Sequence, residues 1–259
     1  MKSIDVHAYE LYEAIGRAFV RLDPWMQVSD WLHLAAGLAL VEYNSRHDVT
    51  PMYCEGTGEW NDLRDAVRSE YLLHATRLLY LCCAIESAVR QLCGKKAARS
   101  PGGVVGAICA NLSAAPVAHP MGYEEVAWQI AVTGRSDPRF KSRVIQAANL
   151  PFHAAGVFLA YEVRNQLAHG TVQLPDAGDQ EDGQLARQVS LVDLSSRAVL
   201  LTLQMMILSY LDAPNVELDD DYGDDDDTDA SHRNRIAKLH LDLVHPRRAR
   251  RVDRPRADV

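Results

Sequence analysis

The 259-residue sequence has no Cys-x-x-Cys pair and no uninterrupted apolar run long enough to cross a membrane. Its five cysteines therefore indicate neither a zinc ribbon nor a redox motif, and their use as apolar side chains favours a reducing compartment. The longest apolar stretch, 198–211, is interrupted by polar side chains and is shorter than the roughly 20 residues that a spanning helix needs. The N-terminal residues contain no apolar signal core. We expect a cytoplasmic protein with no membrane partner.

Charge is nearly balanced over most of the chain but not near its C-terminus. Residues 1–211 carry a net charge of −4, residues 212–229 contain ten acidic and no basic side chains, and residues 230–259 carry +6. Side chains of like charge repel one another and bury little, so 213–259 is expected to be a disordered acidic spacer and basic tail. Within this stretch, residues 236–244 contain alternating leucines that fit either a strand or a partial helical turn.

Apolar residues recur at helical spacing through most of the first 211 residues. Proline and glycine punctuate this pattern, with Pro151 at an expected helix start and Gly170 at the end of the same helix. Two short β-prone runs, 171–174 and 188–192, predict a small hairpin between the last two helices. The predicted fold is all-α, an up-down helical bundle with a β-hairpin insertion. Helices are expected over residues 7–22, 31–43, 60–92, 104–112, 123–132, 151–169 and 193–211.

The most informative segment is the C-terminal end of the helix expected over 151–169. It reads Arg-Asn-Gln-Leu-Ala-His-Gly and carries Arg164, Asn165 and His169. Asn165 and His169 share a helix face, so the Asn165 amide can bond a ring nitrogen of His169 and fix its tautomer. Glu162 lies on that face one turn earlier. Arg164 would not share the face of His169 in a continuous helix, but a helix that ends at residue 170 leaves the His169 ring free to swing.

Glu86 is the only charged residue between Arg77 and Arg90. A buried carboxylate is costly unless it is paired, and Arg164 or His169 is the candidate partner. The local alternative is Arg90, one helical turn away, in an exposed pair that contributes little. Because the run is apolar on both sides, we favour burial.

These residues resemble the signature of HEPN-domain proteins, in which Arg, a small polar residue and a His about five positions later end a long helix. The apolar segment 78–89, with its Ile85-Glu86 pair, is similar to the first core helix of such domains. The resemblance covers about 61–211. It implies three parts: an N-terminal helical extension (1–50), a HEPN-like helical domain (51–212) and the charged tail (213–259).

Catalytic HEPN proteins are metal-independent endoribonucleases, in which the 2′-hydroxyl of RNA attacks the adjacent phosphorus and leaves 2′,3′-cyclic phosphate and 5′-hydroxyl ends. The resemblance implies that His169 is the general acid and base, that Arg164 binds the phosphate and that Asn165 orients the His169 ring. Glu86 and Glu162 are expected as supporting residues of this site. These residue types suit proton transfer and phosphate binding. No metal or other cofactor is expected, because no histidine or cysteine has a ligand-spaced partner.

The resemblance also implies the partners. RNA is the expected substrate, and a homodimer with facing motifs would supply a second His169 to a composite active site. A role in stress response, toxin–antitoxin pairs or anti-phage defence follows from the family, with an antitoxin or regulatory protein as a further partner.

Two alternatives stay open. Arg164 and His169 are ordinary residues for the end of a helix, where the macrodipole favours cations, and some HEPN-like domains lack catalysis. The alternative function is therefore a non-catalytic module that binds RNA, a nucleotide or a protein. The basic tail fits RNA, an acidic partner or an anionic membrane surface, but it equally fits a flexible tail neutralised by the acidic spacer.

Overall fold

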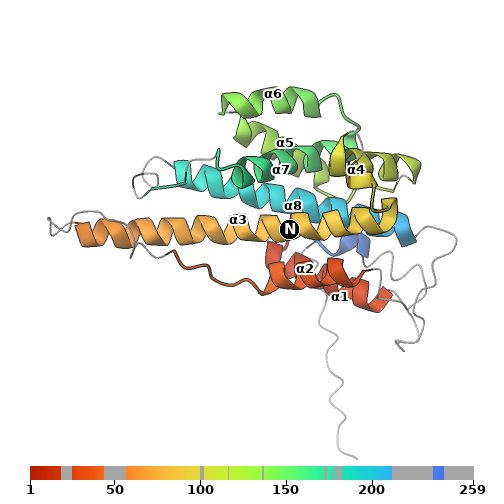
Figure 1. Ribbon diagram of the computed structural model, residues 1–259, viewed down its shortest axis with the longest axis horizontal. Coiled ribbons are helices and arrows are strands. Elements are labelled where there is room, and N and C mark those ends of the chain that lie inside the picture. Colours follow the sequence, from red (N-terminus) through yellow and green to blue (C-terminus); the bar gives the residue numbers. More distant parts are fainter. Residues whose placement is uncertain are drawn as a thin grey trace, which may run out of the picture.

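The computed structural model describes ten stretches of the chain, and they are almost entirely helical (Figure 1). The described residues are 1–18, 25–43, 57–99, 102–115, 117–135, 137–171, 174–176, 178, 183–211 and 236–241. The helices are α1 (Ile4–Ala18), α2 (Met26–Gly37), α3 (Thr57–Cys93), α4 (Gly103–Ala114), α5 (Tyr123–Gly134), α6 (Pro138–Ala147), α7 (Phe152–Ala168) and α8 (Gln184–Leu211), with a 3-10 turn at Ala97–Arg99. The expected all-α class is confirmed for these residues.

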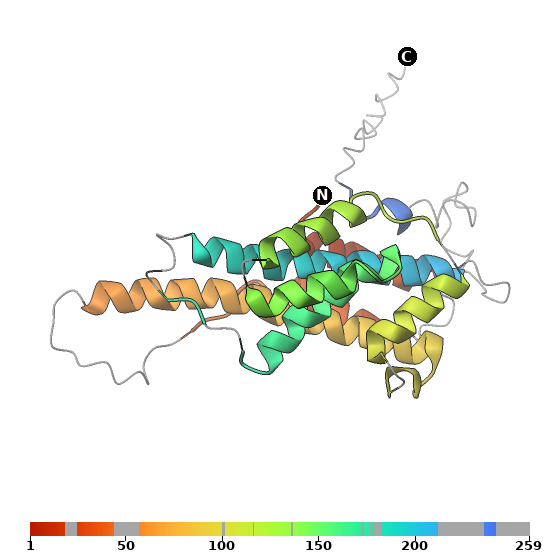
Figure 2. The ribbon, with the colours of Figure 1, turned by 90° about the horizontal axis from the view of Figure 1, so that it is seen from above.

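The two longest helices, α3 and α8, lie side by side along the length of the molecule (Figures 1 and 2). Helices α1 and α2 cover one side of this pair, while α7, α5 and α6 build up the other side and α4 packs near one end. One continuous apolar core joins all of these layers, so α1 and α2 share their core with the rest of the bundle.

Helix α8 is the central helix, and its composition follows from that position. Every residue from 198 to 209 is buried, which requires apolar side chains on all faces rather than on one stripe. By length and composition alone, α8 and most of α3 could cross a membrane. In this structure the same apolar side chains form the core of the bundle, and 72% of the apolar window of α8 is buried by neighbouring helices.

The prediction of a β-hairpin is wrong for its second strand. Residues 188–192 belong to α8, which begins at Gln184, and no strand occurs among the described residues. The segment is helical because Leu185, Val189 and Val192 recur at helical spacing and turn one side toward the core. Residues 172–173 of the first expected strand lie outside the described residues.

Other boundaries also differ from expectation. The second helix was expected to begin at residue 31, but α2 begins earlier, at Met26, and Ser29 is buried inside it. Helix α6 has no counterpart in the helices expected from sequence. It is a short amphipathic helix, and it buries Phe140 and Ala147 on the side that faces the bundle.

Residues 236–241 lie against the bundle as a short helical turn, which is the second of the two conformations expected for them. Ile236, Leu239 and His240 are buried there, and the backbone N–H of Lys2 donates to the carbonyl of His240 at 3.1 Å. The flanking acidic spacer and basic tail, 212–235 and 242–259, lie outside the described residues.

A buried polar network holds this turn to α1 and α8. Oε1 of Gln204 accepts a hydrogen bond from Nε2 of His7 at 3.1 Å, and Nε2 of Gln204 donates to Nδ1 of His240 at 3.3 Å. Gln204 Nε2 also donates to the carbonyl of Ile236. Burial and the neighbouring His240 lower the pKa of His7 to about 3, so this ring is neutral near physiological pH.

Candidate functional site

The end of α7 forms as the sequence predicts. Gly170 adopts a left-handed conformation at φ +62°, and its N–H donates to the carbonyl of Leu167 at 3.2 Å. The N–H of Thr171 reaches back to the carbonyl of Gln166 at 3.0 Å, so these bonds satisfy carbonyls of the last turn. His169 is consequently the first residue beyond the helix, and its side chain is exposed to solvent.

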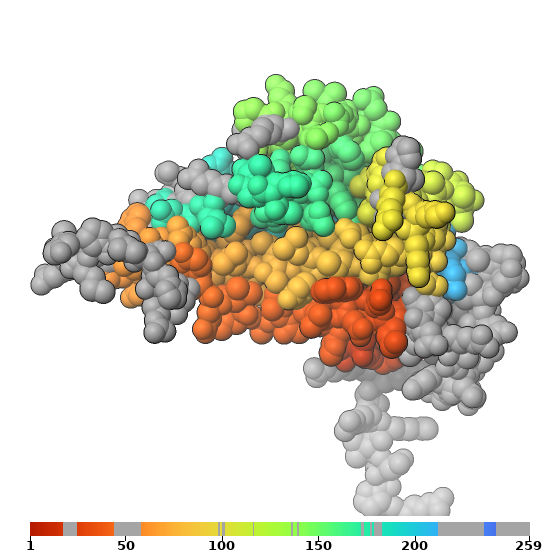
Figure 3. Space-filling view, in the orientation of Figure 1, coloured from red at the N-terminus to blue at the C-terminus, as the bar shows by residue number. Residues whose placement is uncertain are grey.

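Glu86 joins α3 to α7 through an ion pair. Its Oε1 lies 3.5 Å from Nη2 of Arg164, and its Oε2 lies 3.8 Å from Nη2 of Arg90. The Glu86 carboxylate therefore contacts both Arg164 and Arg90, which were expected as alternative partners. Its side chain is 21% exposed, which makes the site half-buried rather than fully buried. On the face seen in Figure 3, α7 lies at the surface directly beside α3.

Asn165 does not act on His169 as expected. Its Oδ1 accepts a hydrogen bond from Nη1 of Arg164 at 3.2 Å. The contact that joins Asn165 to His169 runs through the backbone, from the His169 N–H to the Asn165 carbonyl at 2.9 Å. The side chains separate because residue 169 has left the helix, at φ −91° and ψ 2°. Within the described part of the chain, no hydrogen bond holds the imidazole of His169.

Glu162 also has a different partner from the one its helix face suggests. Its Oε2 lies 3.2 Å from Nε of Arg143, which belongs to α6. This pair ties α6 to α7 and neutralises Glu162. The structure thus brings Arg164, Asn165 and Glu86 together, whereas Glu162 and His169 make no side-chain hydrogen bond or ion pair with that group among the described residues.

Sulfur and phenol side chains surround the Arg164 pair on its buried side. Burial raises the pKa values of the Cys82 and Cys83 thiols and of the Tyr161 hydroxyl, with Glu86 raising and Arg164 lowering each of them. These groups remain protonated near neutral pH, so none of them is a ready nucleophile. Nε of Arg164 and the hydroxyl of Tyr161 are buried and have no hydrogen-bond partner among the residues that the structure describes.

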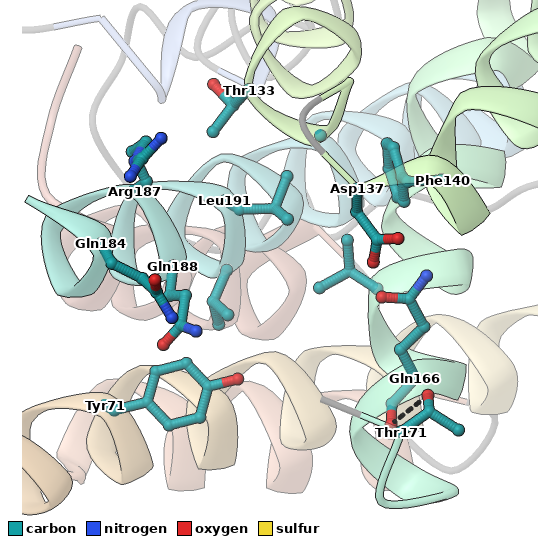
Figure 4. Close-up of a pocket in the computed structure, with 13 residues that line it drawn as sticks. Tyr71, Thr133, Asp137, Phe140, Gln166, Thr171, Gln184, Arg187, Gln188 and Leu191 are labelled. Carbon is teal, nitrogen blue, oxygen red and sulfur yellow. Dashed lines mark hydrogen bonds between the residues drawn. The ribbon is translucent and has the colours of Figure 1, made fainter. Parts of the chain in front are cut away.

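A cavity of about 400 Å³, which was not predicted from the sequence, adjoins the same end of α7 (Figure 4). Its lining includes Val163 and Gln166, which flank Arg164 and Asn165 in the sequence, and Thr171, which lies two residues after His169. The available signal was the pair Gln184 and Gln188, four residues apart on one face of α8, but helical periodicity alone does not place α7 opposite them. Groups of three or more His, Cys, Asp or Glu side chains able to hold a metal ion do not occur among the described residues.

Comparisons of the chain with protein-family models, with curated proteins and with solved structures found no match.

Proposed function

We propose that this chain is a HEPN-like, metal-independent endoribonuclease whose active site is built around Arg164 and His169 at the end of α7. The observation that carries the proposal is the Arg164–Glu86 contact between α7 and α3, together with the exposed histidine that follows α7. An arginine that links two helices, followed five residues later by an accessible imidazole, supplies the cation and the acid–base group that a phosphodiester reaction needs.

Arg164 supplies the permanent cation. Its guanidinium is contacted by Glu86 at 3.5 Å and by Asn165 at 3.2 Å, and its side chain is still 32% exposed. The two contacts restrict the guanidinium to one region, while the exposed part can meet the non-bridging oxygens of a phosphate. Asn165 thus acts on Arg164 in this proposal rather than on His169.

The reaction needs two proton transfers. A base takes the proton of the 2′-hydroxyl as its oxygen bonds to phosphorus, and an acid gives a proton to the 5′-oxygen as the P–O5′ bond breaks. The products are a 2′,3′-cyclic phosphate and a 5′-hydroxyl. Imidazole suits both steps near neutral pH, and such catalysis contributes about 10²–10⁴-fold.

Each chain provides one His169, so two chains are needed for one imidazole per proton transfer. We therefore propose a homodimer with the two α7 ends facing each other, RNA as substrate, and a biological role in stress response or defence, with an antitoxin or regulatory protein as a further partner. The exposure of the α7 end supports access by a second chain and by RNA.

One observation favours the alternative, a non-catalytic module that binds RNA, a nucleotide or a protein. Asn165 bonds Arg164 and leaves the His169 ring unoriented within this single chain. In such a module Arg164 would still contact phosphate, and replacement of His169 would leave binding unchanged.

The test is RNA cleavage by the purified full-length chain in EDTA, with the product ends mapped. The proposal predicts cyclic phosphate and 5′-hydroxyl ends for the wild type and loss of cleavage for His169→Ala. His33→Ala, at an exposed histidine on α2, is the matched control and should cleave as the wild type does. Equal cleavage by His169→Ala overturns the assignment of that residue, and failure of the folded wild type to cleave any RNA favours the binding module.

A further inference from the structure

A basic segment follows Glu86 in the sequence. Residues 87–123 contain four cations, Arg90, Lys95, Lys96 and Arg99, and no Asp or Glu. Arg90 lies in the last turn of α3, and the other three lie in the loop and the 3-10 turn that follow it. All four side chains are exposed, and we call them the basic strip. A chain with a net charge of −8 thus concentrates positive charge at one end of its longest helix.

Neighbouring acids do not neutralise the basic strip. Among the described residues, only Arg90 of the four has an acidic partner, Oε2 of Glu86 at 3.8 Å. The same carboxylate also pairs with Arg164 at 3.5 Å, so one negative charge serves two guanidinium groups. The C-terminus of a helix favours cations within its last turn, which accounts for Arg90 but not for Arg99, six residues beyond the end of α3. The strip therefore holds an excess of positive charge that the fold does not use.

The basic strip begins beside the candidate site. Arg164 and Arg90 each approach one oxygen of the Glu86 carboxylate, so their guanidinium groups are neighbours. From Arg90, α3 continues for about 5 Å along its axis to Cys93, and Lys95 follows two residues later. In Figure 3 the end of α3 and the yellow segment after it lie on the same face of the molecule as α7. The strip consequently extends from Arg164 along one face toward the end of α3.

The chemistry of this surface fits a flexible polyanion. Exposed Lys and Arg side chains contact phosphates without reading bases. Among the described residues, none of the large apolar side chains that are exposed lies between Leu63 and Met121. The strip thus has no apolar side chain to insert into a membrane and no aromatic ring on which a base could stack. A row of cations that starts at the proposed phosphate contact suits the neighbouring phosphates of the same strand.

We propose that the basic strip binds the sugar–phosphate backbone of single-stranded RNA, irrespective of sequence, on one side of the bond that is cut. The proposal rests on the proposed function in one respect, the place of Arg164 as the phosphate contact at that bond. Binding by the strip itself does not require cleavage. It is driven by the release of counterions from the phosphates and weakens as the salt concentration rises.

The direct test measures binding without cleavage. Full-length His169→Ala protein is titrated into a fluorescent oligouridylate at several KCl concentrations. A variant that combines Lys95→Gln, Lys96→Gln and Arg99→Gln in this background removes three phosphate contacts. Each contact with a single strand contributes about 0.7 to the slope of log K against log salt concentration. We expect the slope to become shallower by about 2 and the affinity to fall about tenfold or more.

The matched control combines Arg135→Gln, Lys141→Gln and Lys238→Gln, which removes the same charge from exposed side chains outside the strip. It should bind with nearly the slope and affinity of the parent. Arg99→Gln alone, with an expected change in slope of about 0.7, provides a second variant in case the triple strip variant does not fold.

Three results would overturn the proposal. The first is an unchanged slope and affinity in the folded strip variants, and the second is an equal loss in the control, which would make net charge the determinant. The third is the absence of oligouridylate binding by the folded parent at low salt. Phosphatidylserine vesicles are the second probe, and strip-dependent binding to them without binding to oligouridylate identifies a membrane surface in place of RNA.

Cleavage with His169 intact separates this proposal from the nuclease. The strip variant should raise KM for RNA and leave kcat unchanged, because a contact to a remote phosphate is the same in the ground state and the transition state. Strip-dependent binding without cleavage by the wild type supports the strip and overturns the nuclease. Cleavage by the wild type with KM and binding unchanged in the strip variant overturns the strip and supports the nuclease.

Discussion

Arg164 on α7 and Glu86 on α3 are 78 residues apart in sequence, and their side chains meet at 3.5 Å between Nη2 and Oε1. The pair fixes the arginine relative to the longest helix of the bundle. In the proposed nuclease this contact determines where the phosphate is held.

Replacement of Glu86 by Gln should separate activity from stability. Both side chains are partly exposed, so the free energy of unfolding should fall by only about 1 kcal/mol or less. RNA cleavage should fall about tenfold to a hundredfold, because Arg164 loses the charge that positions it. Urea denaturation and cleavage rates measure the two effects.

Glu13→Gln is the matched control, since it removes the partner of Arg17 at 2.9 Å on the surface of α1. It should leave cleavage unchanged. Unaltered cleavage in Glu86→Gln would show that the ion pair does not position Arg164 for catalysis.

The buried histidine network should make stability depend on pH. His7 has an ordinary pKa of 6.5 when unfolded and about 3 when folded, because of burial and the neighbouring His240, Lys2 and Arg197. The unfolded chain therefore binds more protons between these two values, and stability falls as the pH falls through that window. From about pH 7.5 to about pH 5.5, His7 alone should cost about 1 kcal/mol.

The measurement is urea unfolding of the wild type and His7→Gln at both pH values. The variant should show a smaller difference between the two, whatever its absolute stability. His33→Gln, at an exposed ring, should keep the wild-type difference. A wild-type difference that survives in His7→Gln would contradict a neutral, buried His7.

Residues 236–241 should stabilise the bundle although a long stretch of sequence separates them from α8. Truncation after residue 241 should leave the free energy of unfolding nearly unchanged, whereas truncation after residue 235 should lower it by about 2 kcal/mol or more. The second change exposes the surface that buries Ile236 and Leu239 and removes two partners of Gln204. Equal stability of the two truncated chains would mean that this turn contributes nothing.

Gly134 should be intolerant of a side chain. A Cβ added there would lie 2.1 Å from Cδ1 of the buried Phe140 ring, so Gly134→Ala should cost about 1–3 kcal/mol by overpacking. Adding Phe140→Leu should recover part of this loss. Gly16→Ala is the control, since a Cβ there meets nothing within 4 Å, and it should be neutral or stabilising. Thermal unfolding of Gly134→Ala, of Gly134→Ala with Phe140→Leu, and of Gly16→Ala measures these changes in stability.

The sequence predicted best those features that local chemistry determines. The end of α7 follows from Gly170, which takes a positive φ that other residues avoid, and from the proline before α7. The start of α8 was misplaced because residues 188–192 are β-prone in isolation, while in the bundle the spacing of their apolar side chains gives them a helical, core-facing side.

The candidate site was predictable only in part, for a physical reason. An isolated carboxylate in an apolar run needs a cation, and that requirement alone suggested the partnership of Glu86 with Arg164. It could not show that Arg90 would share the carboxylate, or that Asn165 would bond Arg164 in place of His169. The cavity was missed because its walls come from five helices, whose relative placement depends on the whole core.

The proposed mechanism requires that RNA be cut by its own 2′-hydroxyl at the end of α7. This is measured with a short RNA that the full-length chain cleaves at one position, alongside the same RNA with a single 2′-deoxy sugar immediately before that bond, both in EDTA. We expect cleavage of the first RNA to cyclic phosphate and 5′-hydroxyl ends, and no cleavage of the second at that position. Cleavage of the deoxy-substituted bond would contradict it, because that bond has no 2′-hydroxyl to attack.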